Sequence, residues 1–201
     1  MVIGTKCPEI SGLDFIKGQA HLPPEDSPAI IELWASWCGP CRQVFPHLSE
    51  IARRHRPKGL VVVGVTSEPK AQVQGFVQQM GASMDYSVAS DARGDCQRKL
   101  AGPAGVRGIP HAFVVGADGT IRFSGHPLDP GFASAVDGAV AEAAQRRVPE
   151  PITATRAELE AMGVRELKRV LIERGIPLAG LAEKSDIVDK VLEACTAAPR
   201  R

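Results

Sequence analysis

Two cysteines separated by two residues occur in the run Trp37-Cys38-Gly39-Pro40-Cys41. Such a pair can close a disulfide on itself, or open it by passing two electrons to a partner. An apolar run at residues 29–34 precedes the pair, and a helical pattern follows it. This strand-to-helix setting is typical of a Cys-x-x-Cys motif that is redox-active rather than structural.

The predicted place of the pair at a helix N-terminus gives the two thiols different roles. The first amides of a helix lack intrahelical partners, and the helix dipole adds partial positive charge. The pKa of Cys38 should therefore fall below its usual value of about 8.5, with modest help from Arg42. Cys41, one turn further in, should be more buried and less acidic. We expect Cys38 to attack a target disulfide and Cys41 to resolve the mixed disulfide, while Pro40 suits a first helical turn.

Half of a zinc site is the alternative interpretation of this motif. Zinc takes four ligands, usually from two such pairs. The other cysteines, Cys7, Cys96 and Cys195, are widely scattered, and no His-x3-5-His pair accompanies them. The sequence therefore favours redox chemistry, with electrons stored in the cysteines and neither a metal nor a cofactor. The three remaining cysteines are expected to be small packing residues, and Cys96 is the one to test as a regulatory thiol.

The composition is that of an ordinary globular chain. Its 201 residues predict one or two domains, and 44% apolar residues are enough for a core. The net charge of +1 implies no bulk attraction to nucleic acid or membranes. No apolar stretch approaches the ~20 residues that span a bilayer, and the first eight residues lack the pattern of a signal peptide. We expect a cytoplasmic protein, unless a targeting segment has been removed.

Hydrophobic patterns predict alternating helices and strands up to residue 147. Strands are expected at residues 29–34, 60–65, 111–115 and 120–124. Helices are expected from the cysteine pair to about residue 55, and at residues 70–80, 95–100 and 130–147. Pro46 should kink the first helix. Residues 81–90 are expected to be irregular, with at most a short strand. Asp118-Gly119 marks a turn, so the last two strands form a hairpin. This order predicts an α/β fold with the cysteine pair at the C-terminal end of a central strand.

A separate small unit is expected after residue 147. Two arginines and two prolines lie within residues 146–151, so we place a linker at residues 148–154. Thr155 and Glu158 form a capping-box pattern that starts a short helix. Two more apolar helical patterns follow, up to about residue 196. Roughly forty-five residues with short helices are near the lower size limit for independent folding.

Residues 1–147 resemble the thioredoxin superfamily, most closely its TlpA/ResA-type branch of thiol-disulfide oxidoreductases. The match is carried by residues 32–41, Glu-Leu-Trp-Ala-Ser-Trp-Cys-Gly-Pro-Cys, by Pro46, and by residues 108–113, Gly-Ile-Pro-His-Ala-Phe. Residues 119–121 and 125–127 extend it. The resemblance implies a thioredoxin-like three-layer sandwich with a central mixed β-sheet.

The resemblance also implies how the site is shaped. Ile109-Pro110 should be a cis peptide opposite the cysteines, and the exposed backbone of Ile109 should pair with an extended substrate segment. Trp37 should shape the contact surface. His111 and His126, beside the same groove, are expected to be hydrogen-bonding surface residues rather than catalytic bases.

Two acidic residues are candidates for proton transfer. Glu32 stands in an apolar strand six residues before Cys38, where many thioredoxins have Asp. Burial should raise its pKa, so that it can take the proton of Cys41 and return it. The alternative is an acid held by a structural hydrogen bond or exposed at a strand edge. For Glu68, two interpretations stay open: an acid near the cysteines, as in ResA-like proteins, or a helix-start acid before Pro69.

Residues 155–196 resemble SAP-like domains, particularly those that close the ARMET/MANF family. The match covers residues 164–168, 173–175 and 183–186. Those relatives carry Cys-x-x-Cys between the helices, where this chain has Leu178-Ala179-Gly180-Leu181, so a redox role of that loop is lost. Residues 150–201 hold nine Lys or Arg and nine Asp or Glu. Nucleic-acid binding is therefore weakly supported, and a protein-docking module or a passive appendage is expected.

The function that the sequence favours is a protein thiol-disulfide oxidoreductase that acts as a reductant. The dipeptide Gly39-Pro40 resembles that of reducing relatives, whereas strongly oxidising ones usually carry a histidine there. Its partners would be disulfide-containing clients and a reductase or thiol donor. Two alternatives stay open. A thiol peroxidase is disfavoured because Ala35 stands where such sites usually have Thr, and a non-enzymatic redox-sensing scaffold is the other.

Overall fold

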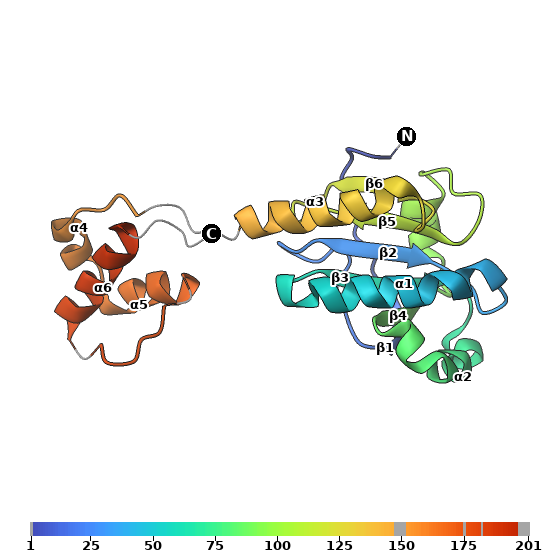
Figure 1. Ribbon diagram of the computed structural model, residues 1–201, viewed down its shortest axis with the longest axis horizontal. Coiled ribbons are helices and arrows are strands. Elements are labelled where there is room, and N and C mark those ends of the chain that lie inside the picture. Colours follow the sequence, from blue (N-terminus) through green and yellow to red (C-terminus); the bar gives the residue numbers. More distant parts are fainter. Residues whose placement is uncertain (1, 147–151, 175, 182, 197–201) are drawn as a thin grey trace. The chain divides into compact units, whose positions relative to one another are not determined.

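The computed structural model describes residues 2–146, 152–174, 176–181 and 183–196. The chain divides into two compact units, Met1–Ala144 and Gln145–Arg201, drawn in Figure 1. The predicted linker at residues 148–154 lies partly outside the described residues.

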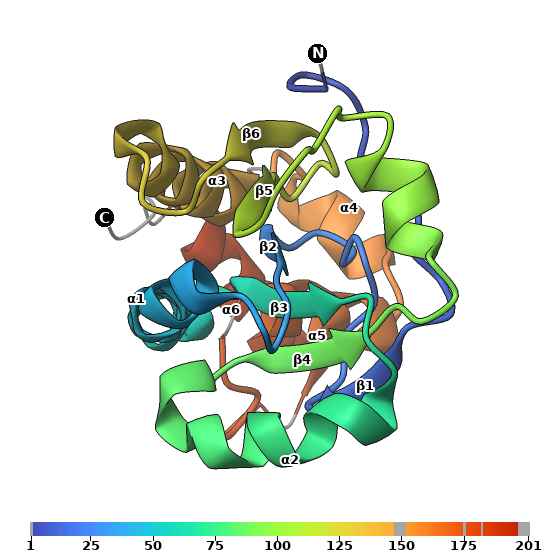
Figure 2. The ribbon, with the colours of Figure 1, turned by 90° about the vertical axis from the view of Figure 1, so that its right-hand side faces the viewer.

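A six-stranded mixed sheet forms the centre of the first unit (Figures 1 and 2). Its strands are β1 (Asp14–Lys17), β2 (Ala29–Leu33), β3 (Val61–Thr66), β4 (Ser87–Ser90), β5 (His111–Val115) and β6 (Ile121–Gly125). They lie in the order β1-β4-β3-β2-β5-β6. The neighbours β2, β3 and β4 run parallel, and the other pairs are antiparallel. The predicted strands and hairpin are confirmed to within one residue at most ends.

Strand β1 is an element that the sequence analysis missed. It has four residues and pairs antiparallel with β4, with a register irregularity between Phe15 and Lys17. The predicted irregular segment at residues 81–90 contains a 3-10 turn, Gly81–Met84, followed by β4. With four residues each, β1 and β4 are too short to give a clear alternating pattern in the sequence. Their pairing with each other stabilises them as strands.

The unit has three layers, as predicted. Helices α1 (Gly39–His55), α2 (Lys70–Met80) and α3 (Pro130–Arg146) pack on one face of the sheet. A π-helical turn, Gln97–Ala101, and the N-terminal segment cover the other face (Figure 2). Successive side chains of a strand point to opposite faces, so Ile30 of β2 and Trp34, directly after β2, join the first cluster and Ile31 joins the second.

Helix α1 begins directly after Cys38 and continues for 17 residues through Pro46. Its apolar stripe, with Val44, Phe45 and Leu48, is fully buried against the sheet. Most of the stability of such a helix comes from this buried face. Its first turn is therefore held firmly at the C-terminal end of β2.

The N-terminal segment also contacts the hairpin. The Gly4 amide donates to the Ile121 carbonyl at 2.8 Å, and the Ile121 amide donates to the Thr5 carbonyl at 2.9 Å. Lys6 and Thr120 form an antiparallel bridge. Residues 4–7 thus lie along the start of β6.

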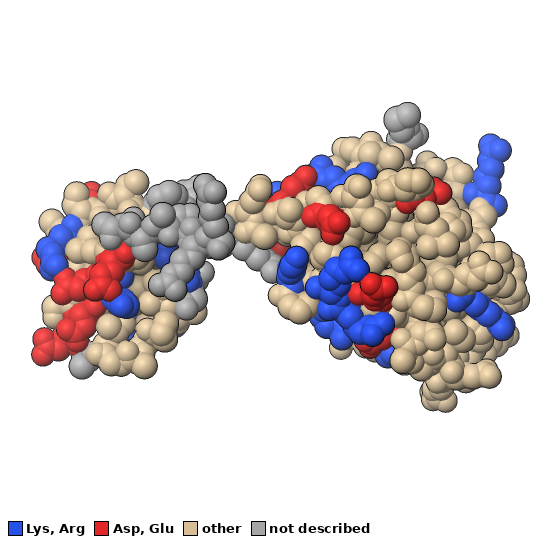
Figure 3. Space-filling view, viewed as in Figure 1, with Lys and Arg blue, Asp and Glu red and all other residues tan. Residues whose placement is uncertain are grey.

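The second unit contains α4 (Arg156–Ala161), α5 (Val164–Glu173) and α6 (Lys184–Thr196). The predicted capping box of Thr155 and Glu158 is present at the start of α4. A small core of its own is formed by Leu159, Leu167, Leu171, Ile187, Val188 and Val191, and Leu178 and Leu181 pack against it. The face drawn in Figure 3 carries Asp and Glu beside Lys and Arg. None of the helices in the described residues is long and apolar enough to cross a membrane.

Candidate active site

Cys38 and Cys41 are joined by a disulfide at the N-terminus of α1. Cys38 is the N-cap residue, and the Cys41 amide donates to its sulfur at 3.2 Å. Gly39 and Pro40 form the first positions of the helix, where the missing N–H of proline leaves no helical bond unmade. Cys41 is fully buried, and 4% of Cys38 is exposed. The arrangement directs backbone N–H groups at the sulfur of Cys38.

The loop before the disulfide is fixed by Glu68 and Arg42. Glu68 accepts from the Ser36 hydroxyl and the Ser36 amide at 2.7 Å each, and from the Thr66 hydroxyl at 3.1 Å. Arg42 donates to the Ser36 carbonyl at 3.0 Å and lies over the ring of Phe76. Glu68 thus bonds a residue two positions before Cys38 and also precedes Pro69, the N-cap of α2. Both features proposed for Glu68 are therefore present: it lies near the cysteine loop and it precedes the start of α2. Its direct hydrogen-bond partner in that loop is Ser36, not a cysteine.

Glu32 is completely buried in the middle of β2. It stands between Ile30 and Trp34 on the face that carries Cys41 and α1. Burial raises the pKa of Glu32 to about 8, and a hydrogen bond from the Tyr86 hydroxyl to Oε2, at 3.4 Å, acts in the opposite direction. The carboxyl therefore holds its proton at neutral pH but is within reach of ionisation. The alternative of a strand-edge acid exposed to water is wrong.

The Ile109-Pro110 peptide is cis, as the family resemblance implied. Leu33, the last residue of β2, pairs with His111, the first residue of β5. Pro110 therefore lies at the same end of the sheet as the loop that leads to Cys38. Pro110 is buried and Ile109 half-buried, whereas Trp37 is 74% exposed. A second cis peptide, Leu22-Pro23, was not predicted.

The two histidines near this end of the sheet are hydrogen-bonded, as predicted. Nε2 of His111 lies 3.0 Å from the Ser124 hydroxyl, and Nδ1 of His126 accepts from the Leu128 amide at 3.1 Å. Burial lowers the pKa of His111, with Asp129 acting against it. His111 is therefore neutral at physiological pH.

The other two cysteines with described side chains lie on the opposite face of the sheet. Cys7 and Cys96 are free and belong to the second buried cluster. Burial raises the pKa of Cys7 to about 11 and that of Cys96 to about 12, with Asp91 adding to the latter. Both are packing residues, as predicted, and the structure gives no support to Cys96 as a regulatory thiol. The side chain of Cys195 is outside the described residues.

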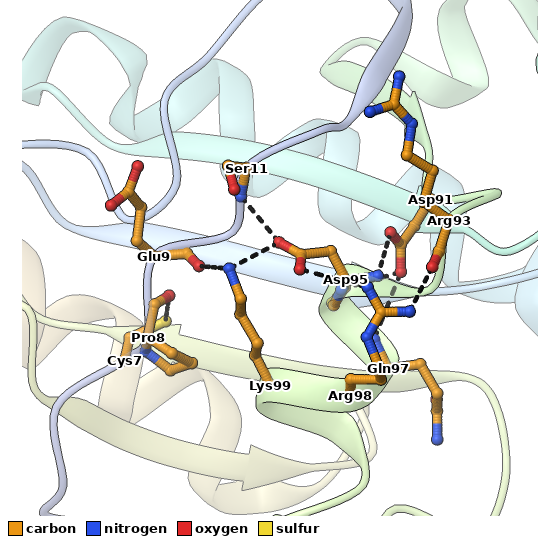
Figure 4. Close-up of polar contacts among 11 residues, drawn as sticks. Cys7, Pro8, Glu9, Ser11, Asp91, Arg93, Asp95, Gln97, Arg98 and Lys99 are labelled. Atoms are coloured by element: carbon orange, nitrogen blue, oxygen red, sulfur yellow. Dashed lines mark hydrogen bonds and ion pairs between the residues drawn. The ribbon is translucent and has the colours of Figure 1, made fainter.

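Polar contacts on that face hold the N-terminal segment in place (Figure 4). Ser11 donates its amide to Asp95 at 3.0 Å, and Lys99 contacts both Asp95 and the Glu9 carbonyl at 3.0 Å. Asp91 accepts from the amides of residues 95–97 and so begins the helical turn. In the described part of the chain, no three His, Cys, Asp or Glu side chains gather as a metal site would require.

Solved structures define the class of fold. The chain is similar to the crystal structure of a candidate DsbE thiol:disulfide interchange protein from Chlorobium tepidum, with a TM-score of 0.57 and 28% identity, over 70% of this chain and 96% of that one. It is also similar to the thioredoxin domain of a thiol-disulfide oxidoreductase from Bacteroides vulgatus, with a TM-score of 0.58 and 18% identity, over 70% and 99%. The first unit has a thioredoxin-like fold.

Residues 3–124 match the model of the AhpC/TSA family, and the chain belongs to this family. Among curated proteins, it is similar to the thiol-disulfide oxidoreductase ResA of Bacillus thuringiensis, with 26% identity over 92 residues, or 45% of this chain and 50% of that protein. It is also similar to a DsbE homolog of Paracoccus denitrificans, with 30% identity over 125 residues, or 60% and 64%. The chain spans about half the length of the ResA relatives that it matches.

Three neighbours of the site were missed by sequence reasoning: Ser36, Gly64 and Tyr86. A serine before the motif, a glycine in a strand and the single tyrosine of the chain carry no signal by themselves. Glycine within the apolar run at residues 60–65 was the one available hint, because a strand glycine often marks a close approach of another group.

Proposed function

We propose that this protein is a thiol-disulfide oxidoreductase that reduces disulfides in proteins or small thiol compounds. The observation that carries the proposal is the Cys38–Cys41 disulfide at the N-cap of α1, with the buried acid Glu32 on the same face of the sheet. The similarity to the thiol-disulfide oxidoreductase ResA and to a DsbE thiol:disulfide interchange protein supports it.

In the first step the reduced protein attacks its client. The Cys41 amide and the helix dipole favour the thiolate form of Cys38. This thiolate forms a bond to one sulfur of the client disulfide, the client S–S bond breaks, and the released client thiolate takes up a proton from water. The product is a mixed disulfide between Cys38 and the client.

In the second step Cys41 releases the client. Its thiol gives a proton to the Glu32 carboxylate, and the resulting thiolate attacks the sulfur of Cys38. The bond between Cys38 and the client breaks, and the client leaves as a thiolate. With the pKa of Glu32 at about 8, about one tenth of the carboxyl is ionised at pH 7. The product is the Cys38–Cys41 disulfide described here.

The cycle consumes two electrons from an external dithiol or a reductase, which reopens the Cys38–Cys41 disulfide. The direction, reduction of the client, rests on the resemblance of Gly39-Pro40 to the dipeptide of reducing relatives. Exposed Trp37 and the backbone at Ile109 would contact the client beside the sulfurs.

Reduction of insulin, with dithiothreitol as the electron donor, tests the activity. We expect the wild-type protein to accelerate insulin reduction, Cys38→Ser to lose this activity, and Cys41→Ser to accumulate mixed disulfides with clients from an extract. If insulin is not reduced and Cys41→Ser traps nothing, the redox-sensing scaffold is favoured instead.

Peroxide consumption tests the remaining alternative. Ala35, buried three residues before Cys38, has no hydroxyl, and the neighbouring Ser36 hydroxyl is bonded to Glu68. We therefore expect peroxide removal no faster than that of a Cys38→Ser control.

For the second unit we propose a SAP-like module that docks a partner protein. Its three helices, its own apolar core and the equal numbers of acidic and basic residues within residues 150–201 support this proposal. Pull-down of partners with the full chain, compared with a chain that ends after residue 146, tests this docking role.

The cytoplasm stays the predicted compartment, and fractionation of cells tests this prediction.

A further inference from the structure

Three core side chains converge on Gly64 of β3. Glu32 lies directly beside Gly64 in the parallel β2–β3 pair. A Cβ atom on Gly64 would lie 2.9 Å from Glu32 Oε2, 3.1 Å from Trp34 Nε1 and 3.1 Å from Tyr86 Cε2. The first distance is shorter than Cβ contacts in proteins and the other two are tighter than most of them, so a side chain at residue 64 would force the carboxyl, the indole or the phenol ring to shift.

The carboxyl in this place has few hydrogen-bond donors. In the described residues, Glu32 Oε1 and Trp34 Nε1 are buried without a partner. The Tyr86 hydroxyl donates to Oε2 at 3.4 Å. A buried carboxyl with so little compensation is unfavourable when charged. One donor therefore has a large influence on where the carboxyl points and when it ionises.

Tyr86 is suited to act as that donor over the whole physiological pH range. It lies directly before β4 and is 5% exposed. Burial, together with the neighbouring Glu32 carboxyl, raises the pKa of Tyr86 well above its usual value. Its hydroxyl therefore keeps its proton and always has one to donate.

We propose that Tyr86 is a positioning residue for the redox reaction: its hydroxyl holds the Glu32 carboxyl in place and favours the ionised form that accepts the proton of Cys41. Gly64 provides the space in which the two groups meet. The inference rests on the proposed function, because it gives Glu32 the role of proton acceptor in the second step.

Tyr86→Phe tests the proposal, since it removes the hydroxyl and keeps the ring. Loss of a hydrogen bond to the carboxylate should raise the pH at which Glu32 ionises by about one unit. The rate of client release from the Cys38 mixed disulfide should then fall about tenfold at pH 7 and approach the wild-type rate above pH 9.

Two controls separate this effect from general destabilisation. In the Glu32→Gln background, Tyr86→Phe should change the rate no further. Thr120→Val removes another buried hydroxyl, which donates to the Asp118 carboxylate at 2.9 Å in the β5–β6 hairpin, and should leave the pH profile unchanged. A Tyr86→Phe profile that coincides with that of the wild type would overturn the proposal.

A spectroscopic test needs no catalysis. Tyr86 is the only tyrosine of the chain, so protein labelled with carbon-13 at the tyrosine ζ position gives one NMR signal. We expect this signal to titrate with a midpoint near pH 8 in the wild type, following Glu32, and to lose the step in Glu32→Gln. An unchanged step in Glu32→Gln, or none in the wild type, would show that the two groups are not coupled. Failure of insulin reduction with an intact NMR step would refute the proposed function, but not the contact.

Discussion

Ser36 binds both carboxylate oxygens of Glu68, its hydroxyl donating to Oε1 and its amide to Oε2, each at 2.7 Å. The remaining polar group of Ser36, its carbonyl, accepts from Arg42. Every polar group of this residue is therefore fixed, two positions before Cys38. The acid after β3 and the loop after β2 are joined across the end of the sheet.

Breaking this contact should loosen the loop. We expect Glu68→Gln and Ser36→Ala each to lower the free energy of unfolding by roughly 1–3 kcal/mol, because each leaves a partner with an unmade bond. The double variant should lose less than the sum, as residues in one network are coupled. Urea unfolding of the four proteins measures this, and strict additivity would contradict the contact.

Glu32 should make the stability of the first unit depend on pH. Its pKa is raised from 4.5 to about 8 in the folded protein. The stabilisation of the folded state by this group is fully present below about pH 4.5. It is lost as pH rises to about 8, at about 1.4 kcal/mol per pH unit, because the unfolded chain releases the proton first.

Glu32→Gln should remove this dependence, since glutamine does not ionise in this range. Relative to the wild type, the variant should gain roughly 3 kcal/mol of stability between pH 5.5 and pH 8, measured by urea unfolding at several pH values. The matched control is Glu25→Gln at an exposed carboxyl, which should follow the wild type. Parallel curves for Glu32→Gln and the wild type would mean that Glu32 is already charged in the folded protein.

Trp37 should matter for clients and not for folding. It is 74% exposed next to Cys38, so Trp37→Ala should change the free energy of unfolding by no more than about 0.5 kcal/mol. The KM for a protein client should rise several-fold, whereas reduction by dithiothreitol should stay unchanged. Leu128→Ala, at another exposed apolar side chain, is the comparison. A large loss of stability in Trp37→Ala would show that the indole packs on the fold.

Cys7 and Cys96 should resist alkylation in the folded protein. With their pKa values raised to about 11 and about 12, about 0.1% or less of either thiol is ionised at pH 8, and the thiolate is the form that reacts. Iodoacetamide should label reduced Cys38 in minutes, and these two only after unfolding in urea. Mass spectrometry of the peptides distinguishes the sites. Rapid labelling of Cys96 in the native protein would instead support the hypothesis that Cys96 is a regulatory thiol.

Much of the architecture was predictable because the patterns are local. The apolar run at residues 60–65, the Asp118-Gly119 turn and the cysteine pair each identify an element or its end from neighbouring residues. The burial of Glu32 followed from its place within an apolar strand. The cis state of Pro110 came from family resemblance rather than from local chemistry.

What the sequence did not predict depends on contacts between distant positions. Glu32 and Tyr86 are 54 residues apart, and Ser36 and Glu68 are 32 apart. Such pairs meet only when the register between strands is known, and composition does not determine register. Strand β1 was missed for the same reason, because its pairing with β4, rather than its own four residues, makes it a strand.

The bonds of residues 4–7 to residues 119–121 have a consequence for solubility. β6 is an outer strand of the sheet, and unpaired outer strands invite pairing with another chain. The N-terminal segment occupies backbone hydrogen-bonding groups at the beginning of that strand, so another chain cannot pair with them there. A protein shortened to start at Glu9 should therefore form dimers or larger aggregates that light scattering detects, whereas the full chain should not.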